Sequence, residues 1–283
     1  MVEILENLSS PSLLSALEAN MIKYWINYGT APGRVLYEGP DFIRFITGLP
    51  FTLFNGVFRA QLSLDTVDSS INEVIQSAAQ WNVPLNWYVG PTTLPTDLGK
   101  HLLRQGFEYE GEMPVMTVEL TKLQEPHMPA NFSIRPVPDI EGINTWIKIV
   151  ATGFGFPEQA HSALADLELS LGVLPDSVAR RYVGYQNGVP VATSELVLEA
   201  GVAGIYAVTT LPEARRQGIG ANMTALPLIE ARSQGYKIGT LQASSMGHPV
   251  YRQLGFQDLY KFELYSWHGH KGVMDNEKLN RTS

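Results

Sequence analysis

The stretch "YAVTTLPEARRQGIGANM", Tyr206 to Met223, determines the fold that we predict for this chain. A β-rich run ends at Thr210, and a short loop leads to the segment Arg215–Gly220 and then to an amphipathic helix. The first amide groups of a helix have no partner inside the helix, and glycine lets an anion approach them closely. The stretch therefore predicts a phosphate-binding strand–loop–helix unit.

Two other kinds of phosphate loop fit this stretch less well. A Walker loop needs Gly-Lys followed by Ser or Thr, which is absent here. A dinucleotide-binding fingerprint needs a third Gly or Ala where Met223 stands. Arg215 and Arg216 add positive charge beside the glycines, which suits a pyrophosphate.

Here the sequence resembles the GNAT superfamily of acyl-CoA-dependent N-acetyltransferases. The family motif Arg/Gln-x-x-Gly-x-Gly/Ala is met by Arg215, Gly218 and Gly220. The run "VTTLP" precedes the motif, and the strand-like run "IGTLQAS" follows it. The ending "VYRQLGF" matches the family pattern Tyr-x-x-x-Gly-Phe. The resemblance covers roughly residues 131–267.

The resemblance implies that acetyl-CoA, as acyl donor, lies between the strand ending at Thr210 and the strand Ile238–Ser244. Strand backbone would bond the pantetheine arm, and the backbone N–H groups of Arg216–Ala221 would hold the pyrophosphate. Ser244 stands where many relatives carry an Asn. The implied acetyl-CoA residues are Val208, Thr209, Thr210, Arg215, Arg216, Gln217, Gly218, Ile219, Gly220, Ala221 and Ser244, and no metal is expected.

The same resemblance makes Tyr251 the acid that protonates the departing thiolate. A phenol titrates near ~10 and a thiol near ~8.5, so this transfer is feasible but only assisted. The ordinary alternative is a core tyrosine whose hydroxyl bonds to backbone.

The general base is open, because some relatives place a Glu about where Gly204 falls. Glu195 and Glu199 are candidates, although exposed strand carboxylates are the more ordinary interpretation. Tyr206 is another, since a period of two puts it on the same sheet face as Val208. A water chain is equally possible.

Two similar stretches, "LLRQGF" at Leu102–Phe107 and "VYRQLGF" at Val250–Phe256, indicate an internal duplication. The first copy aligns Leu103 with Tyr251, and its loop region "LSLDTVDSSINE" has no Gly, no Arg and three acidic residues. We therefore predict two tandem GNAT-like units in an α/β fold, each a mixed, mostly antiparallel twisted sheet flanked by helices. The expected domains are a degenerate unit at 1–125, a catalytic unit at 126–268 and a polar tail at 269–283.

Sequence periodicity predicts the main elements of this fold. Helices are expected over residues 12–28, 69–80, 96–105, 140–154, 160–171 and 218–234, with a short helix around "HPVYRQ". The Asn-Gly pair inside "QNGV" and the Ala-Gly pair inside "EAGV" predict two hairpin turns between three successive strands.

Composition restricts the partners and the compartment. The chain has 283 residues, a formal net charge of −8 and no Cys. We therefore expect no nucleic-acid partner, no disulfide and a cytoplasmic location. No apolar run is long enough to span a membrane, so no membrane partner is expected. The oligomeric state stays open between monomer and dimer.

Together these features predict an acetyl-CoA-dependent N-acetyltransferase that acts on a primary amine of a small molecule or peptide by direct attack. The alternative is a non-catalytic acyl-CoA-binding regulatory module.

Overall fold

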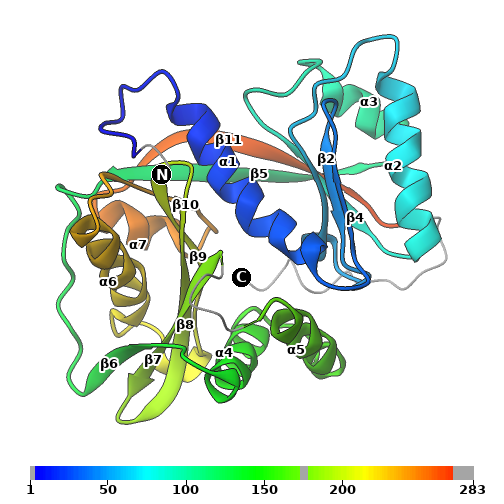
Figure 1. Ribbon diagram of the computed structural model, residues 1–283. Coiled ribbons are helices and arrows are strands. Elements are labelled where there is room, and N and C mark those ends of the chain that lie inside the picture. Colours follow the sequence, from blue (N-terminus) through cyan, green and yellow to red (C-terminus); the bar gives the residue numbers. More distant parts are fainter. Residues whose placement is uncertain (1–3, 173–177, 270–283) are drawn as a thin grey trace. The chain divides into compact units, whose positions relative to one another are not determined.

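The computed structural model describes residues 4–172 and 178–269 (Figure 1). The chain divides into two compact units, and each is made of separate chain segments. The C-terminal unit holds described residues 4–24, 115–172 and 178–259. The N-terminal unit holds described residues 25–114 and 260–269.

The N-terminal unit is a sheet with two helices. Its strands lie in the order β1-β2-β3-β4-β11, and only the β3–β4 pair is parallel. Helix α2 connects that parallel pair and buries Val67, Ile71, Val74 and Ala78 against the sheet residue Trp87. The elements are η1 (Asn27–Thr30), β1 (Val35–Glu38), β2 (Ile43–Ile46), η2 (Thr52–Phe54), β3 (Asn55–Phe58), α2 (Val67–Trp81), β4 (Leu85–Val89), α3 (Leu98–Arg104) and parts of β5 (Glu108–Glu119) and β11 (Gln257–Trp267).

From its parallel strand pair onward, the C-terminal unit has the same element order. Its strands lie in the order β5-β10-β9-β8-β7-β6, and only the β9–β10 pair is parallel. Helix α6 connects that pair, as α2 does in the other unit. The elements are α1 (Leu13–Ile26), β6 (Phe132–Pro136), α4 (Ile140–Gly153), η3 (Glu158–Ala160), α5 (His161–Ser170), β7 (Ala179–Gln186), β8 (Val189–Glu199), β9 (Val202–Thr210), η4 (Pro212–Ala214), α6 (Ile219–Ser233), β10 (Ile238–Gln242) and α7 (His248–Gln253).

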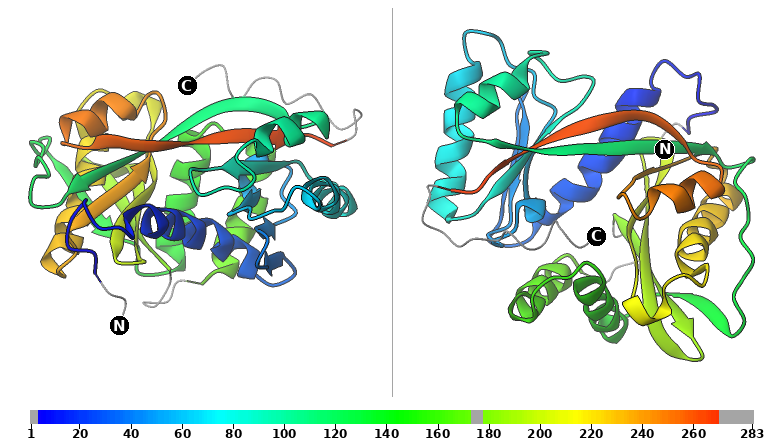
Figure 2. Two further views of the ribbon diagram at one scale, coloured as in Figure 1. Left: turned by 90° about the horizontal axis from the view of Figure 1, so that it is seen from above. Right: turned by 180° about the vertical axis from the view of Figure 1, so that it is seen from behind.

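Helices cover both faces of the sheet in the C-terminal unit, as the alternation of side chains along the strands shows. Tyr182 packs in the cluster that holds the α6 residues, while its neighbour Val183 packs with residues of α4. Side chains of successive strand residues point to opposite faces, so α6 and α4 cover opposite faces of the sheet. Figures 1 and 2 show α6 and α7 on one face and α4 and α5 on the other.

The predicted helices and both predicted hairpin turns are confirmed, with helix ends within about two residues of the expected positions. The turn residues Asn187 and Gly188 have φ of 51° and 80°, and Ala200 and Gly201 have φ of 51° and 77°. Positive φ at both positions is that of a type I′ turn, which matches the twist of paired strands. The α/β fold class with mixed sheets flanked by helices is likewise confirmed.

The compact units differ from the predicted division at 125/126 in three segments. Residues 4–24, which include most of α1, belong with the C-terminal unit, and so do residues 115–125. Residues 260–269, which include most of β11, belong with the N-terminal unit. The domain division into 1–125 and 126–268 therefore stays a prediction, and positions 270–283 of the expected tail lie outside the described residues.

The backbone corrects the alignment of the two similar stretches. The Phe256 amide donates to the Tyr251 carbonyl at 3.0 Å, and the Phe107 amide donates to the Leu102 carbonyl at 3.1 Å. Leu102 is fully buried, whereas Leu103 is half exposed. The counterpart of Tyr251 is therefore Leu102 and not Leu103, because "LLRQGF" lacks the Leu that precedes the glycine in "VYRQLGF".

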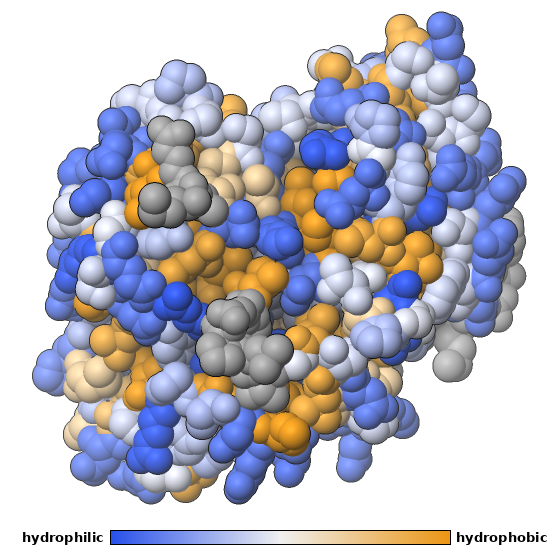
Figure 3. All heavy atoms as spheres, viewed as in Figure 1, coloured by the Kyte–Doolittle hydropathy of each residue, from blue (hydrophilic) through white to orange (hydrophobic). Residues whose placement is uncertain are grey.

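None of the described helices is both long and apolar enough to cross a membrane. Hydrophilic side chains cover much of the face drawn in Figure 3, with hydrophobic side chains in smaller patches between them.

Candidate functional site

Strands β9 and β10 pair over only part of their length. Their parallel register consists of Ala203 with Gly239 and Gly204 with Thr240. Beyond Gly204, β9 continues to Thr210 and pairs with β8 only, within the part of the chain that the structure describes. Backbone groups on the β10 side of this segment can therefore bond an extended ligand as a strand would.

A β-bulge lies in this unpaired part of β9. On β8, Thr193 is opposite Thr209 and Glu195 is opposite Tyr206, so two residues of β9 face one of β8. Ala207 has a φ of 47°, and its carbonyl accepts a 2.9 Å hydrogen bond from the Thr193 hydroxyl. A bulge re-aims the side chains that follow it.

The bulge corrects the predicted shared face of Tyr206 and Val208. Val208 packs against the cluster on the α6 face of the sheet. Tyr206 stacks on Tyr24 of α1, with ring centroids 4.0 Å apart. The two side chains lie on opposite faces, because the extra residue in the bulge shifts the period of two.

The N-terminus of α6 lies directly after the predicted phosphate loop. Gly218 caps the helix in a left-handed conformation with a φ of 77°, and no side chain caps the first turn. The first turn contains no acidic residue. Arg216, Gln217 and Gly218 are exposed, whereas Ile219 is buried and anchors the helix start. This terminus presents amide donors and a positive dipole end to an anion.

Arg215 holds the loop to the rest of the unit. Its Nε donates to the Thr210 carbonyl at 3.0 Å, and its Nη2 donates to the Gly153 carbonyl at 3.3 Å. Arg216 has a φ of 63° and an exposed side chain. Of the two arginines, Arg215 shapes the loop and Arg216 extends from it toward solvent.

Tyr251 lies in α7 with its ring against Gly247 and near Phe256. The side chain is buried, and this burial raises the pKa of the phenol to about 12. Within residues 4–172 and 178–269, no group hydrogen-bonds the Tyr251 hydroxyl. The alternative of a core tyrosine bonded to backbone is therefore wrong for the described structure.

Ser244 is exposed just after β10, and its hydroxyl accepts a 3.1 Å hydrogen bond from the Gly247 amide. This bond orders the turn that leads into α7. Gln242, two residues earlier, is half-buried, and its Nε2 has no hydrogen-bond partner among the described residues. Sequence reasoning missed Gln242, although its place at the end of β10 could have indicated it.

Glu195 is fully buried in an ionic cluster, so the interpretation of an exposed strand carboxylate is wrong. Its Oε2 accepts a 2.7 Å hydrogen bond from the Tyr24 hydroxyl. Its Oε1 lies 3.0 Å from Nε of Arg181, an ion-pair contact. Arg181 Nη2 donates to Oε2 of Glu168 at 2.7 Å, and the guanidinium lies over the Trp146 ring.

Burial raises the pKa of Glu195 to about 7. The nearby charge of Glu168 raises this pKa as well, whereas the charge of Arg181 and the bond from Tyr24 lower it. A carboxyl with such a pKa can take up and release a proton near neutral pH. Perturbed carboxyls of this kind concentrate at functional sites, although structural ion pairs also produce them.

Asn20 of α1 occupies the space beside Gly204. Its Nδ2 donates to the carbonyls of Val197, Glu199 and Val202 at 3.1 to 3.2 Å. A Cβ on Gly204 would lie 2.0 Å from Asn20 Oδ1. Gly204, where the resemblance would place a Glu, therefore cannot carry a side chain in this structure. Glu199 Oε1 accepts a hydrogen bond from the Ala200 amide at the hairpin turn.

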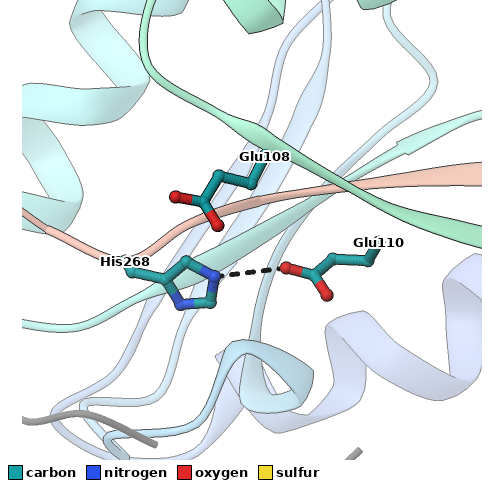
Figure 4. A group of neighbouring side chains, drawn as sticks. All are labelled: Glu108, Glu110 and His268. Carbon is teal, nitrogen blue, oxygen red and sulfur yellow. Dashed lines mark hydrogen bonds and ion pairs between the residues drawn. The ribbon is translucent and has the colours of Figure 1, made fainter. Parts of the chain in front are cut away.

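A separate group of titratable side chains lies in the N-terminal unit (Figure 4). Glu108 and Glu110 stand on the same face of β5, and His268 follows β11. His268 Nε2 lies 3.2 Å from Oε1 of Glu110. One ligand atom from each of the three residues lies within 4.8 Å of the others, and all three residues are exposed. The arrangement is that of a surface ion pair with a second carboxylate beside it.

Comparison with known proteins agrees with this geometry. The family model of the acetyltransferase (GNAT) domain matches residues 133–258. None of the curated protein sequences matches the chain.

Solved structures share the fold across most of the chain. A GCN5-related N-acetyltransferase from Kribbella flavida is 20% identical with a TM-score of 0.68, over 89% of this chain and 96% of that one. A functionally unknown conserved protein from Staphylococcus epidermidis is 16% identical with a TM-score of 0.64, over 86% and 95%. A tandem GNAT protein from the clavulanic acid biosynthesis pathway is 11% identical with a TM-score of 0.60, over 88% and 86%.

These structural likenesses show the fold. The family match covers the predicted phosphate loop, the strands β9 and β10 that separate beyond Gly204, and Tyr251. Residues 133–258 of this chain therefore match the acetyltransferase (GNAT) domain family, and the chain shares the fold of a GCN5-related N-acetyltransferase.

Proposed function

We propose that the chain is an acetyl-CoA-dependent N-acetyltransferase that transfers an acetyl group to a primary amine of a small molecule or peptide. The observation that carries the proposal is the separation of β9 from β10 beyond Gly204, directly beside the uncapped start of α6. One end of this arrangement suits a pyrophosphate, and the other suits an amide-containing arm. The family of the domain is one of acetyltransferases.

In this proposal, the backbone of Val208, Thr209 and Thr210 bonds the pantetheine arm, and the amides of Arg216–Ala221 hold the pyrophosphate. Arg215 keeps the loop in place through the two carbonyls to which it donates. Arg216 adds charge at the exposed side of the loop. Ser244 orders the turn before α7, beside the cofactor.

Acetyl-CoA supplies an activated thioester, and the chain must supply a proton for the thiolate that leaves. Tyr251 is the proposed donor, because its hydroxyl has no partner among the described residues and its phenol is protonated at neutral pH. A pKa of about 12 makes full transfer costly, so the phenol chiefly donates a hydrogen bond to the developing thiolate. An amide near Val208 would stabilise the oxygen that becomes negative during attack.

Both units have a parallel strand pair joined by a helix, followed by a short helix that ends in Gly-Phe. This shared order supports the proposal that the N-terminal unit is a degenerate copy. Its loop between β3 and α2 lacks glycine and has Asp65 and Asp68 near the helix start. Such a loop disfavours a pyrophosphate.

The test is release of free CoA thiol by the full chain from acetyl-CoA, with a panel of polyamines, amino sugars, amino acids and peptides. Turnover that depends on one amine supports the proposed function. Tight binding of acetyl-CoA without turnover on any amine contradicts it and supports a non-catalytic acyl-CoA-binding module.

A further inference from the structure

Both units have a residue with positive φ at the same distance from their parallel strand pair. Gly56 of β3 and Gly204 of β9 each pair with the parallel neighbouring strand. Three residues further along, Arg59 and Ala207 have φ of 51° and 47°. The residues that follow can therefore be matched one to one between the two units.

Beyond its bulge, β9 presents backbone groups on the side away from β8. The Leu211 amide donates to the Val191 carbonyl of β8 at 2.8 Å. Backbone groups of successive strand residues point alternately to the two sides, so those of Val208 and Thr210 point away from β8. Among the residues that the structure describes, no strand pairs with β9 on that side. The Val208 carbonyl and the Thr210 amide are therefore available to the pantetheine arm.

The counterparts of these two groups are already bonded in the N-terminal unit. By the matched spacing, Ala60 corresponds to Val208, and Leu62 corresponds to Thr210. The Leu94 amide donates to the Ala60 carbonyl at 2.9 Å, and the Leu62 amide donates to the Leu94 carbonyl at 3.0 Å. Leu94 thus bonds to the end of β3 as a short parallel strand would.

The bonded segment, residues 92–94, comes from the link between β4 and α3. That link spans residues 90–97, whereas the corresponding link between β10 and α7 spans only residues 243–247. The segment is ordered from within, because the Thr93 hydroxyl accepts a 2.9 Å hydrogen bond from the Gly90 amide. The longer link of the N-terminal unit turns back along β3.

We propose that the 92–94 segment is an internal ligand of the N-terminal unit. It occupies the place beside β3 that corresponds to the place of the pantetheine arm beside β9. The inference rests on the proposed function, which supplies that arm. It also adds a second reason why this unit binds no acyl-CoA. Even a ligand without phosphates finds the Ala60 carbonyl and the Leu62 amide already paired. One chain therefore binds one molecule of acetyl-CoA.

The first test is amide hydrogen exchange of the full chain, resolved by residue, with and without acetyl-CoA. We expect the Leu62 amide to be protected already in the free chain and to stay unchanged when acetyl-CoA is added. The Thr210 amide should exchange fast in the free chain. It should slow about 10²-fold at an acetyl-CoA concentration about 100 times the Kd. Titration calorimetry should give one acetyl-CoA per chain.

Pantetheine separates the effect of the 92–94 segment from that of the acidic loop. Pantetheine carries no phosphate, so Asp65 and Asp68 do not repel it. A cleft that only repels phosphates would bind pantetheine in both units, and exchange would then change at Leu62 as well as at Thr210. We expect pantetheine to slow exchange at Thr210 alone. A change at Leu62 would overturn the inference.

Gln61→Ala tests what holds the segment in place. The Gln61 Nε2 donates to the Thr92 carbonyl at 2.6 Å, and a parallel bridge joins Gln61 to Leu94. Loss of the side-chain bond should speed exchange at Leu62 about fivefold. Gln80→Ala, the same change at an exposed position of α2, is the matched control and should leave this rate unaltered. Equal rates in the two variants would mean that the segment does not protect the Leu62 amide, and would overturn the inference.

Failure of the inference differs from failure of the proposed function. Two molecules of acetyl-CoA per chain, or fast exchange at Leu62 in the free chain, overturn the inference and leave the proposed function intact. A chain in which neither calorimetry nor the Thr210 amide responds to acetyl-CoA contradicts the proposed function. The inference then falls with it, because the 92–94 segment has no arm to correspond to.

Discussion

The Tyr206 hydroxyl donates a 2.6 Å hydrogen bond to Oδ1 of Asn20, a residue 186 positions earlier in the chain. Asn20 is fully buried and also donates to three carbonyls of the β8–β9 hairpin. One amide side chain thus satisfies four polar groups of the sheet, which makes α1 a structural part of the C-terminal unit.

Asn20→Ala should therefore lower the free energy of unfolding by about 2–4 kcal/mol, because it leaves several buried polar groups without a partner. Denaturant unfolding of the full chain measures this change. Ser15→Ala, an exposed position on the same helix, is the matched control and should change the free energy by less than about 0.5 kcal/mol. Equal small effects of the two variants would contradict the role given to Asn20.

Gly204→Ala should destabilise the chain by about 2–3 kcal/mol, since the added Cβ would lie 2.0 Å from Asn20 Oδ1. The double variant Asn20→Ala with Gly204→Ala should cost less than the sum of the two single variants, because the first change opens space for the second. A double-mutant cycle by denaturant unfolding gives the coupling. Strict additivity would mean that Tyr206, whose Cε2 would lie 2.6 Å from the added Cβ, and not Asn20, limits this position.

Gly218→Ala and Gly220→Ala should differ sharply. A side chain at Gly218 must adopt a φ of 77°, which costs about 1–2 kcal/mol, whereas an added Cβ on Gly220 meets its nearest atom at 3.9 Å. We expect Gly218→Ala to weaken acetyl-CoA binding about tenfold by titration calorimetry and Gly220→Ala to change it little. The opposite ranking would place the phosphates elsewhere along the loop.

Arg216→Glu should weaken acetyl-CoA binding about tenfold or more at low salt, with the difference shrinking as salt screens the charges. Arg104→Glu, an exposed position of the N-terminal unit, makes the same change in net charge and is the control. Calorimetry at two salt concentrations measures both. Similar losses in the two variants would show an effect of net charge alone.

The elevated pKa of Glu195 makes stability depend on pH. Its pKa of about 7 in the folded chain lies above the value of 4.5 for a free glutamate, so the folded state binds more protons between these values. Stability from this group is present below about pH 4.5 and is lost as pH rises through 7. Between pH 5 and 7.5, the unaltered chain should therefore lose stability relative to Glu195→Gln, measured by denaturant unfolding. Parallel pH profiles would mean that Glu195 is ionised throughout.

Local sequence signals predicted most of the fold. These signals each act over a few residues: the turn pairs, the glycines of the phosphate loop and helical periodicity. The turn pairs are Asn187–Gly188 and Ala200–Gly201. Sequence patterns alone do not show where one strand shifts by a single residue relative to the strand it pairs with. Counted outward from Asn187–Gly188, the hairpin sets Arg181 opposite Ser194, but an irregularity at Gly184/Tyr185 moves it opposite Glu195.

For the same reason, the sequence did not predict the buried cluster around Glu195. Glu195 looked like an ordinary strand carboxylate because nothing nearby in sequence indicates Tyr24 as its partner, 171 positions away. Tyr206 was assigned to the wrong face because the bulge has no glycine, and Ala207 takes the positive φ instead. Long-range contacts and bulges are tertiary properties, and only the structure supplies them.

Strand β5 begins in the N-terminal unit and ends in the C-terminal unit, and β11 crosses in the other direction. Residues 115–119 of β5 supply the strand that pairs with β10, and α1 supplies Asn20 and Tyr24. No single cut in the chain can release the C-terminal unit whole, because its described residues come from separate segments. Recombination that exchanges one half of such a gene would leave β5 and β11 intact but pair them with strands from another parent, so we expect the two halves to be inherited, and engineered, as one piece.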